Sequence, residues 1–360
     1  MKIAIIGLPN SGKTTVFNAL TRGTAETTAY ASGQLEPNVA TVKVPDERLA
    51  VLTRMFNPKK TTPADVQYVD VGGLSSGARQ SGGLPPALLN FIGGADALLH
   101  VARAFEDDTV AHPEGSVNLA RDVESVDLEL AFSDMAIIER RLAKLNAEIG
   151  KMPAKEREVR IAERDLLTLL LQELEAGKPI RDVELSDEQE RLLRGYQFLT
   201  AKPMLLVINI SEAQLKNPPQ IAYAHRHSNV LALSGKVEAE LAQLDDEDAK
   251  AFMEDLGITT AARERAISLS YQLLGLISFL TAGPDEVRAW TITRNTPAVE
   301  AAGAIHSDIQ RGFIRAEIVA YDDLIKAGGM AEAKKHGTVR MEGKTYIVKD
   351  GDVCHFLFNV

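Results

Sequence analysis

The sequence predicts an α/β protein with a mostly parallel sheet, a helical insertion and a separate C-terminal α+β domain. An apolar strand at 2–6 runs directly into a glycine-rich octet and a helix. Strand and helix patterns alternate over residues 1–122 and again over 200–275, which is typical of a parallel sheet covered by helices. Residues 123–199 between them carry helical periodicity, and 276–360 read as a small module of their own.

The composition is that of a soluble globular protein. The chain has 360 residues, is 45% hydrophobic and 25% charged, and carries a formal net charge of −10. That charge disfavours uniform coating of a nucleic acid but leaves room for a local basic patch. Cys354 is the only cysteine, so we expect no internal disulfide and a cytoplasmic setting. We expect neither a signal peptide nor a membrane partner, because the chain enters a strand at once and no apolar run reaches about 18 residues.

The octet GLPNSGKT after the first strand fits G-x-x-x-x-G-K-[ST], the phosphate-binding loop of P-loop nucleotidases. Gly7 and Gly12 let the backbone curl so that its N–H groups face phosphate oxygens. Lys13 brings a positive charge to the β and γ phosphates, and Thr14 offers a hydroxyl to Mg²⁺. The segment 15–20 reads as a helix whose N-terminus favours an anion. A glycine-rich turn without a ligand is the alternative.

Residues 123–199 read as a helical hairpin inserted into the α/β domain. Apolar residues recur at spacings of three and four along a first helix, and a second set lies on one side of a helix beyond 151–154. The two sets are Leu128, Ala131, Met135, Ile138, Leu142, Leu145 and Ile149, then Val159, Ala162, Leu166, Leu170 and Leu174. Two helices lying flat on the domain are the alternative. Residues 139–164 hold eight Lys or Arg against five Asp or Glu, which indicates either a solvated face or a docking surface for a phosphate backbone.

The C-terminal module contains three predicted elements. Residues 287–292 read as a strand and 298–311 as a helix. Residues 346–358 read as a hairpin that turns at Asp350 and Gly351. Basic and acidic residues nearly balance in this module, so charge alone does not mark it as an RNA binder.

Three later motifs narrow the class of nucleotidase. The strand 66–69 ends in D-x-x-G, where Asp70 can hold Mg²⁺ through water and the Gly73 N–H can sense the γ-phosphate. An N-x-x-E motif begins at Asn209, and S-G-K begins at Ser234. This is the order of motifs in the Ras-like GTPases, whose base-reading motif is normally N-K-x-D. An ordinary turn at a strand end is the alternative for D-x-x-G.

Two departures from the Ras-like pattern bear on specificity and rate. Glu212 stands where an aspartate pairs with guanine N1–H and N2–H₂, and the usual lysine beside Asn209 is missing. Guanine specificity should therefore weaken, and adenine becomes acceptable. Leu74 stands where Ras-like GTPases have the glutamine that orients the attacking water, which a leucine cannot do. Another group must orient that water, or hydrolysis is slow.

With these motifs the sequence resembles the Obg-like ATPase (YchF) family of translation-factor-class P-loop NTPases over essentially the whole chain. The most specific stretches are GLPNSGKTTVFNAL, LEPNVATVKVPDERL, YVDVGGL, KPMLLVINISE, FLTAGPDEVRAWTI and YIVKDGDVCHFLFNV. The resemblance implies a Ras-like domain with an inserted helical coiled coil and a C-terminal TGS domain of β-grasp fold. It also implies a preference for ATP over GTP, association with ribosomes, and RNA contact through the hairpin or the TGS domain.

The resemblance assigns the site residues by position. Those expected to hold the phosphates are Asn10, Ser11, Gly12, Lys13, Thr14 and Thr15. Those expected to line the base are Asn209, Ile210, Glu212 and Ser234. Thr14 and Asp70 would face Mg²⁺, and Gly73 the γ-phosphate. His112 aligns with the family's mobile-loop histidine implicated in hydrolysis and, with Lys13, is the catalytic candidate; an exposed loop histidine is the alternative.

The chain departs from the family in both switch segments. Gln34 precedes the LEPN signature where the family has threonine, which removes a hydroxyl expected to reach Mg²⁺. Beyond Leu74 the second switch is rich in serine and glycine, and Pro85 and Pro86 should stiffen its far end. We therefore expect weakened or altered turnover. Asn10 matches a position that helps to hold a monovalent cation in related GTPases, which makes K⁺ a candidate cofactor.

These observations predict a slow switch that hydrolyses Mg·ATP and reports its nucleotide state to a ribosomal partner, with His112 or a partner orienting the water. A nucleotide-binding module with little hydrolysis, motivated by Gln34 and Leu74, is one alternative. A GTP-preferring switch of the Obg class is another. A P-loop kinase for a small molecule fits less well, because it leaves N-x-x-E, S-G-K and the C-terminal module unexplained.

Overall fold

The computed structural model divides the chain into two compact units, each described by itself below. The described residues are 1–23, 37–71 and 86–359. The first unit comprises Met1–Ala40 and Gln67–Ala266, and the second comprises Thr41–Val66 and Ile267–Val360. The three-domain boundaries expected from the sequence stay a prediction. No helix within the described ranges is long and apolar enough to cross a membrane.

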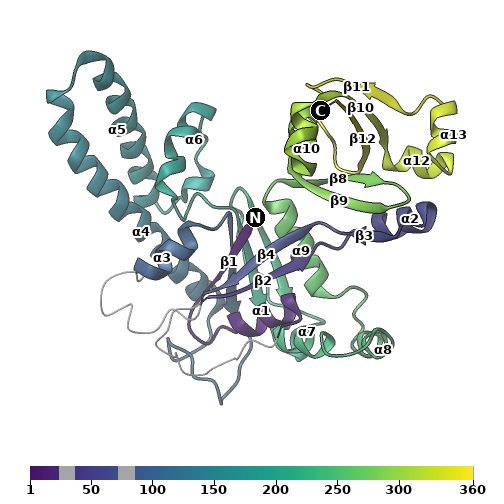
Figure 1. Ribbon diagram of the computed structural model, residues 1–360. Coiled ribbons are helices and arrows are strands. Elements are labelled where there is room, and N and C mark those ends of the chain that lie inside the picture. The colour runs from purple at the N-terminus through teal and green to yellow at the C-terminus, as the bar shows by residue number, and fades with distance from the viewer. Residues whose placement is uncertain (24–36, 72–85, 360) are drawn as a thin grey trace. The chain divides into compact units, whose positions relative to one another are not determined.

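The first unit is built on a six-stranded sheet (Figure 1). In sheet order its strands are β2 Asn38–Lys43, β4 Asp65–Asp70, β1 Lys2–Ile6, β5 Ala97–Arg103, β6 Met204–Asn209 and β7 Ser228–Leu233. Strand β1 pairs in parallel with β4 and β5, and β6 pairs in parallel with β5 and β7. The chain order reverses beside β1, and ligands of open α/β sheets bind at the carboxyl ends of strands at such a point. The predicted α/β class is therefore confirmed.

Helices cover this sheet and position the candidate site. Those of the first unit outside the hairpin are α1 Lys13–Thr21, α3 Pro86–Gly93, α7 Gly235–Leu241, α8 Asp246–Leu256 and the first residues of α9 Ala262–Leu273. Ile92 of α3 packs against Leu98 of the sheet in one buried cluster. Glu238 of α7 caps the start of α9, because its carboxylate accepts the N–H groups of Ala262 at 2.7 Å and Arg263 at 3.1 Å.

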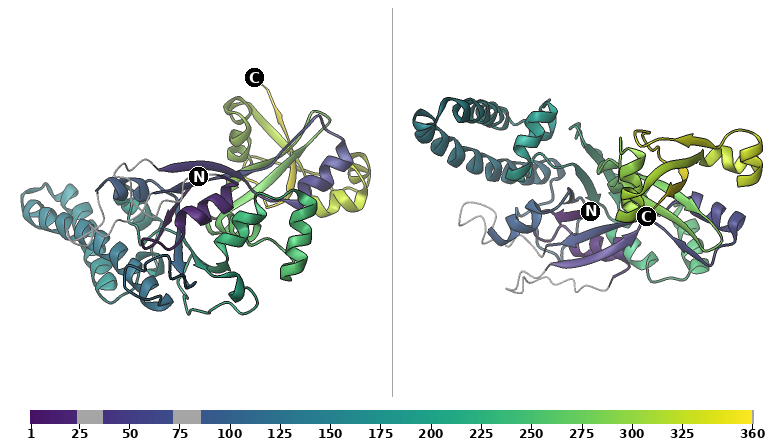
Figure 2. Two further views of the ribbon diagram at one scale, coloured as in Figure 1. Left: turned by 90° about the horizontal axis from the view of Figure 1, so that it is seen from below. Right: turned by 45° about the horizontal axis from the view of Figure 1, so that its top comes forward.

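The predicted helical insertion is present as a hairpin. Helix α4 spans Leu119–Glu148 and α5 spans Ala154–Glu175, with a 3₁₀ turn at Ile149–Lys151 between them. Figures 1 and 2 show the two helices side by side in every view. A shorter helix, α6 Asp187–Leu193, follows. Residues shared by the hairpin core include Ile138, Leu145, Leu166, Leu167, Leu170 and Leu174.

Two of the apolar residues listed for the hairpin helices do not lie in the interface between them. Leu128 is 45% exposed and Val159 is 57% exposed, although both were expected in the helix interface. The reason on α4 is that its first half packs on the sheet through Val126 and Leu130, whereas its second half packs on α5. A single helix of 30 residues thus serves two cores with two different faces.

The second unit contains another six-stranded sheet, of mixed direction. In sheet order its strands are β11 Arg340–Glu342, β10 Phe313–Ala320, β12 Asp352–Phe358, β8 Leu276–Ala282, β9 Glu286–Thr293 and β3 Lys60–Thr62. Strand β10 runs antiparallel to β11 and β12, whereas β12 runs parallel to β8. Its helices are α2 Glu47–Phe56, the end of α9, α10 Ala298–Ile305, α11 Ser307–Arg311, α12 Tyr321–Ala327 and α13 Met330–Lys335.

Two expectations for this unit are corrected. The helix expected over 298–311 is broken at His306, whose φ of −163° is extended. The hairpin expected over 346–358 does not form, because β12 pairs with β10 and β8 instead of the preceding segment. Gly351 does turn the chain, with a φ of 81°. The adjacent Asp350 is held by the backbone N–H of Ser278 at 2.9 Å, which directs the chain into the centre of the sheet.

Residues 41–66 belong to the second unit although they include the end of β2 and the start of β4, two strands of the first sheet. Strand β3 pairs in parallel with β9 as the edge strand. Leu52 of α2 is fully buried, and Arg48 of the same helix binds Asp350 with Nη1 2.9 Å from Oδ2. Asp46 caps α2 through the N–H of Arg48 at 3.0 Å.

Candidate functional site

The phosphate-binding loop between β1 and α1 curls because three of its residues adopt positive φ angles. Gly7 has φ 145°, Asn10 has φ 60° and Gly12 has φ 88°. At Gly7 a side chain is also excluded by space, since a Cβ atom would lie 2.3 Å from the carbonyl oxygen of Val101 on β5. The glycines expected from the motif are therefore required by the backbone path.

Lys13 is a buried cation at the start of α1, 7% exposed. Its Nζ donates to the carbonyl oxygens of Gly7 at 3.1 Å and Leu8 at 2.8 Å. Burial lowers the pKa of Lys13 to about 8, and the charge of Asp70 opposes that shift. A charge held in this way is stabilised by an incoming anion, as phosphate binding requires.

Thr14 and Asp70, which are both predicted to face Mg²⁺, contact each other. The Thr14 hydroxyl donates to Asp70 Oδ2 at 2.8 Å. The second oxygen, Oδ1, is buried and has no hydrogen-bond partner among the described residues. Burial raises the pKa of Asp70, and the Thr14 hydroxyl and the Lys13 charge oppose that shift.

Thr14 and Asp70 have the chemistry to bind a metal ion that is also coordinated by a bound ligand. The described ranges contain no group of three or more His, Cys, Asp or Glu side chains that could hold a metal ion. Mg²⁺ is commonly bound by one or two protein oxygens together with substrate phosphates. The unpartnered oxygen of Asp70 beside the Thr14 hydroxyl has the chemistry of such a site.

Asn209 joins the phosphate loop to the end of β6. Its Nδ2 donates to the Ser11 carbonyl at 3.0 Å, and its Oδ1 accepts the N–H of Gly235 at 3.0 Å. Ser234 is buried and caps α7, with its hydroxyl accepting the Val237 N–H at 3.4 Å. The structure therefore brings Asn209 to the phosphate loop, and Ser234 directly precedes the Gly235 that Asn209 binds.

The remaining base-side candidates lie on the turn after β6. Ile210 is buried and its N–H bonds to the Leu233 carbonyl at 3.0 Å, whereas Glu212 is exposed and begins a 3₁₀ turn. Thr15 lies at the start of α1, where its Cγ2 would be 3.4 Å from a Cβ atom at Gly235.

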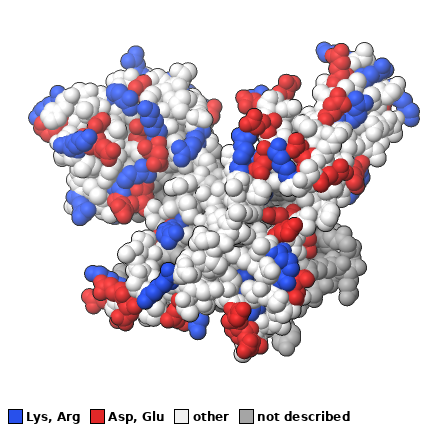
Figure 3. All heavy atoms as spheres, turned by 180° about the vertical axis from the view of Figure 1, so that it is seen from behind, with Lys and Arg blue, Asp and Glu red and all other residues white. Residues whose placement is uncertain are grey.

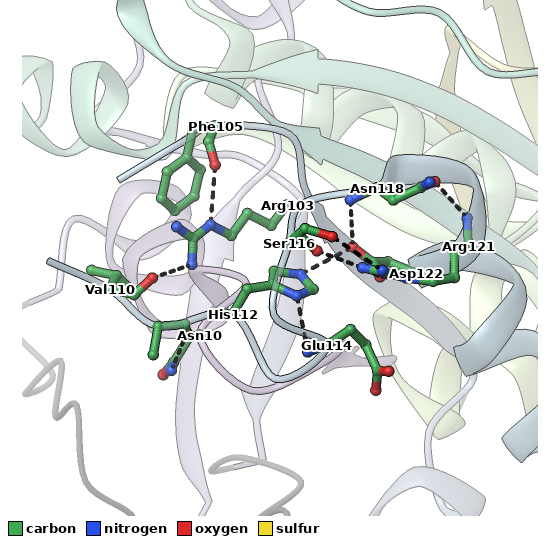
Figure 4. Close-up of polar contacts among 11 residues, drawn as sticks. Asn10, Arg103, Phe105, Val110, His112, Glu114, Ser116, Asn118, Arg121 and Asp122 are labelled. Atoms are coloured by element: carbon green, nitrogen blue, oxygen red, sulfur yellow. Dashed lines mark hydrogen bonds and ion pairs between the residues drawn. The ribbon is translucent and has the colours of Figure 1, made fainter. Parts of the chain in front are cut away.

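The side chain of His112 is buried, although the residue as a whole is half-buried. Figure 4 shows its ring turned toward Asp122, with Nε2 3.0 Å from Oδ2. The Glu114 N–H donates to Nδ1 at 3.1 Å. Only 5% of the His112 side chain is exposed. Burial lowers the pKa of His112, and the charge of Asp122 opposes that shift.

Two side chains anchor the loop that carries His112 (Figure 4). Asn10 Nδ2 donates to the Ala111 carbonyl at 2.9 Å, and Arg103 Nη1 donates to the Val110 carbonyl at 2.9 Å. Arg103 also stacks over the Phe105 ring, 4.5 Å from its centroid. A Cβ atom at Gly12 would lie 4.0 Å from that ring, so Phe105 borders the phosphate loop. In the sequence, Arg103 directly follows the mostly apolar run 97–102, in which His100 is the one polar residue.

Gln34, Gly73, Leu74 and Pro85 lie outside the described residues. Pro86 begins α3, although its side chain is not among those described.

The basic hairpin surface is partly neutralised within the hairpin. Arg160 pairs with the buried Glu163 at 2.7 Å, and Arg164 pairs with Asp165 at 2.7 Å. Arg141 also reaches Glu163, with Nε 2.7 Å from Oε1. The face of the hairpin at the upper right of Figure 3 mixes Lys and Arg with Asp and Glu. The exposed basic residues without an ion pair to another described residue include Lys151, Lys155 and Arg157.

Comparison with known proteins agrees with this architecture. A family model described as a 50S ribosome-binding GTPase matches residues 2–131. The model of the YchF GTPase C-terminal region, described as a protein of unknown function, matches residues 276–359. The ribosome-binding ATPase YchF of Bacillus subtilis is 43% identical over 364 residues, covering 99% of this chain and 98% of that protein. The chain belongs to the YchF family.

Other YchF relatives extend the same result. The ribosome-binding ATPase YchF of Escherichia coli is 40% identical, covering 100% of this chain and 99% of the relative. Obg-like ATPase 1 of Caenorhabditis elegans is 36% identical, covering 100% and 92%. The solved YchF GTPase of Schizosaccharomyces pombe superposes with a TM-score of 0.85 at 30% identity, covering 99% of this chain and 97% of that chain. The predicted family and fold class are confirmed.

Proposed function

We propose that the protein is a slow, Mg²⁺-dependent ATP-hydrolysing switch that acts on the ribosome in the cytoplasm. The observation that carries the proposal is the convergence of three motifs at the carboxyl ends of parallel strands. Thr14 of the phosphate loop bonds Asp70 at the end of β4, and Ser11 of the same loop bonds Asn209 at the end of β6. Relatives named ribosome-binding ATPases support both the nucleotide and the partner.

The phosphate subsite consists of the loop from Asn10 to Thr15. Lys13 exchanges its bonds to loop carbonyls for phosphate oxygens, which offsets its burial. Thr14 and Asp70 would hold Mg²⁺, which when bound neutralises phosphate charge. Asn10 leaves its Oδ1 available to a monovalent cation, since its Nδ2 is the atom bonded to Ala111.

The base subsite favours adenine. Asn209 already uses both ends of its amide on Ser11 and Gly235, and the Ile210 N–H is bonded to Leu233, so base selection falls to Glu212 and the Ile210 carbonyl. Glu212 is one methylene longer than the aspartate that guanine requires. We expect calorimetry of the purified protein to give about micromolar or tighter binding of Mg·ATP and weaker binding of Mg·GTP.

A matched pair of variants sharpens this test. Glu212→Asp shortens the carboxylate and should shift preference toward GTP, whereas Glu212→Gln removes the charge at nearly constant length and should not. Binding of GTP at least tenfold tighter than ATP by the unaltered protein would show instead a GTP-preferring switch.

Hydrolysis depends on His112 orienting the attacking water, because Leu74 cannot. We expect single-turnover phosphate release from ATP at less than about one per second, the regime of switch NTPases without an activator. Lys13→Ala should abolish release, while Lys59→Ala, whose side chain is 82% exposed, should not. No release by the unaltered protein would favour the binding module with little hydrolysis.

The ribosomal contact is assigned to the unpaired basic residues of the hairpin. Replacing Lys151, Lys155 and Arg157 by glutamine should reduce co-sedimentation with ribosomes, increasingly so at higher salt. A control with the same charge change replaces the exposed residues Lys59, Lys60 and Lys344 of the second unit. Loss of pelleting in the control alone would move the contact to the C-terminal unit.

A further inference from the structure

His112 is held by a carboxylate that lies outside every nucleotide-binding motif of the sequence. Asp122 stands in the first turn of α4, and its Oδ2 lies 3.0 Å from His112 Nε2. The two side chains are only 5% and 3% exposed. A hydrogen bond to an ionised acceptor in such a setting is stronger than one in water.

The second ring nitrogen of His112 is also occupied. The Glu114 N–H donates to Nδ1 at 3.1 Å, so Nδ1 is an acceptor and the ring proton resides on Nε2, facing Asp122. The ring is neutral and has no nitrogen left for a water molecule. In this position His112 cannot orient a nucleophile.

Asp122 is itself fixed by its neighbours. Its Oδ1 accepts Arg121 Nε at 3.0 Å and Nη2 at 2.8 Å, and its Oδ2 also accepts the Asn118 N–H at 3.3 Å. Arg121 reaches back to the Ser116 carbonyl at 2.5 Å. Figure 4 shows these contacts closing the loop onto the start of the helix, so the position of Asp122 is set independently of His112.

The docked loop is also bonded to the phosphate site. Asn10 donates to the carbonyl of Ala111, the residue before His112, at 2.9 Å. Asn10 belongs to the loop that must rearrange its polar contacts when phosphates enter. Binding of phosphates can therefore alter the bond that holds the segment carrying His112.

We propose that Asp122 is a positioning residue that holds His112 in a docked, non-hydrolysing position, which nucleotide binding must release before turnover. This inference rests on the proposed catalytic role of His112. Release exchanges the bonds of Nε2 to Asp122 and of Nδ1 to Glu114 for solvent, and it involves no covalent step. The intrinsic rate is then limited by the fraction of molecules in which His112 is undocked.

The kinetic test uses the full-length protein with saturating Mg·ATP. Asp122→Ala should raise the single-turnover rate about tenfold, because that is the approximate worth of one charge-assisted hydrogen bond. Asp122→Asn, which keeps an oxygen acceptor, should raise it less. Glu124→Ala changes an exposed acid on the same helix and should leave the rate unchanged.

The rise must depend on His112. In a His112→Ala background, Asp122→Ala should have no further effect. An equal effect in both backgrounds would show a merely structural role and overturn the proposal. A fall in rate with Asp122→Ala would show that Asp122 supports His112 in its working position, which also overturns it.

A spectroscopic test separates this proposal from the proposed function. Nitrogen NMR of ¹⁵N-histidine-labelled protein, assigned with His112→Ala, should show a neutral ring with its proton on Nε2. Asp122→Ala, or addition of Mg²⁺ with a non-hydrolysable ATP analogue, should shift those signals toward a mixture of tautomers. Signals of a freely titrating imidazole, unmoved by Asp122→Ala, would overturn the docking. Unchanged turnover in His112→Ala would refute the catalytic role of His112 instead, with the NMR result still deciding the docking.

Discussion

Substitutions at Gly12 and Asn209 should have non-additive effects on the free energy of unfolding, because a side chain at Gly12 would displace the amide of Asn209. A Cβ atom at Gly12 would lie 2.2 Å from Asn209 Nδ2, far inside contact distance. Asn209 is 4% exposed and uses both ends of its amide, on Ser11 and Gly235. Gly12→Ala therefore forces the amide out of a bonded, buried position.

The size of the coupling follows from these contacts. Asn209→Ala removes two hydrogen bonds, at a cost of about 2 kcal/mol in unfolding free energy. Gly12→Ala costs about 1 kcal/mol in left-handed backbone strain, from φ 88°, and about 2 kcal/mol more through the displaced amide. With Asn209 truncated, the next neighbour of the new Cβ is Phe105 at 4.0 Å, an ordinary contact. The double variant should then lose about 3 kcal/mol rather than the additive sum of about 5 kcal/mol.

Urea unfolding of the four proteins of this cycle measures the coupling. The expected interaction free energy is about 2 kcal/mol, well above the roughly 0.5 kcal/mol seen between independent sites. Gln220→Ala, which removes an exposed amide, serves as the control for loss of an amide alone. Additive costs for Gly12→Ala and Asn209→Ala would refute the reasoning, because the clash would then have been absorbed elsewhere.

Three further predictions concern the hairpin and the C-terminal unit. Leu167→Ala, at a fully buried position, should cost about 3 kcal/mol in urea unfolding and leave ATP affinity by calorimetry unchanged; a loss of affinity would contradict the separation of the two cores. Burial raises the pKa of Glu163, but hydrogen bonds from two arginines and a tyrosine outweigh it and bring the pKa to about 2, below the ordinary 4.5. Its stabilisation, roughly 3 kcal/mol, is therefore present above about pH 4.5 and lost as the pH falls toward 2. Unfolding of Glu163→Gln should thus differ from the unaltered protein at pH 7 and converge with it at low pH, unlike the exposed control Glu158→Gln; a pH-independent difference would exclude the charge as the cause. Asp350→Ala should lower the melting temperature by several degrees, because it removes an ion pair with Arg48 and a backbone bond, and an unchanged melting temperature would show that the turn holds without them.

The parts predictable from the sequence are those set by short-range chemistry. A loop that binds phosphate needs glycines at backbone positions that side chains cannot occupy. Gly7 and Gly12 therefore identify the loop in the sequence. Strand β6, Met204–Asn209, lies within the segment 200–275 that was expected to alternate strands and helices, and it is an apolar run that ends at Asn209, as expected of a strand buried on both faces. The meeting of Thr14 with Asp70 follows from parallel strands ending at one edge of the sheet.

The parts missed depend on contacts between distant segments. Nothing local distinguishes Asp122 from other acids near a helix start, and its partnership with His112 exists only once the loop is closed. The hairpin expected over 346–358 was predicted from the turn residues Asp350 and Gly351. Its second half instead forms β12, which pairs with β10 and β8. Leu128 fits the helical spacing but is exposed. The spacing of apolar residues does not show where a long helix stops packing on the sheet and begins to pack on another helix.

The placement of residues 41–66 bears on how this protein can be divided. Strand β3 pairs with β9, and Arg48 pairs with Asp350. A truncation that removes the C-terminal residues from 267 onward would therefore leave β3 and Arg48 without their partners. An isolated fragment from residue 267 onward would conversely lack an edge strand and helix α2. Loss of activity on deleting the C-terminal residues would therefore report residues 41–66 left without their partners, as well as a missing domain. A fragment intended to isolate the second unit must therefore carry residues 41–66 together with the C-terminal residues.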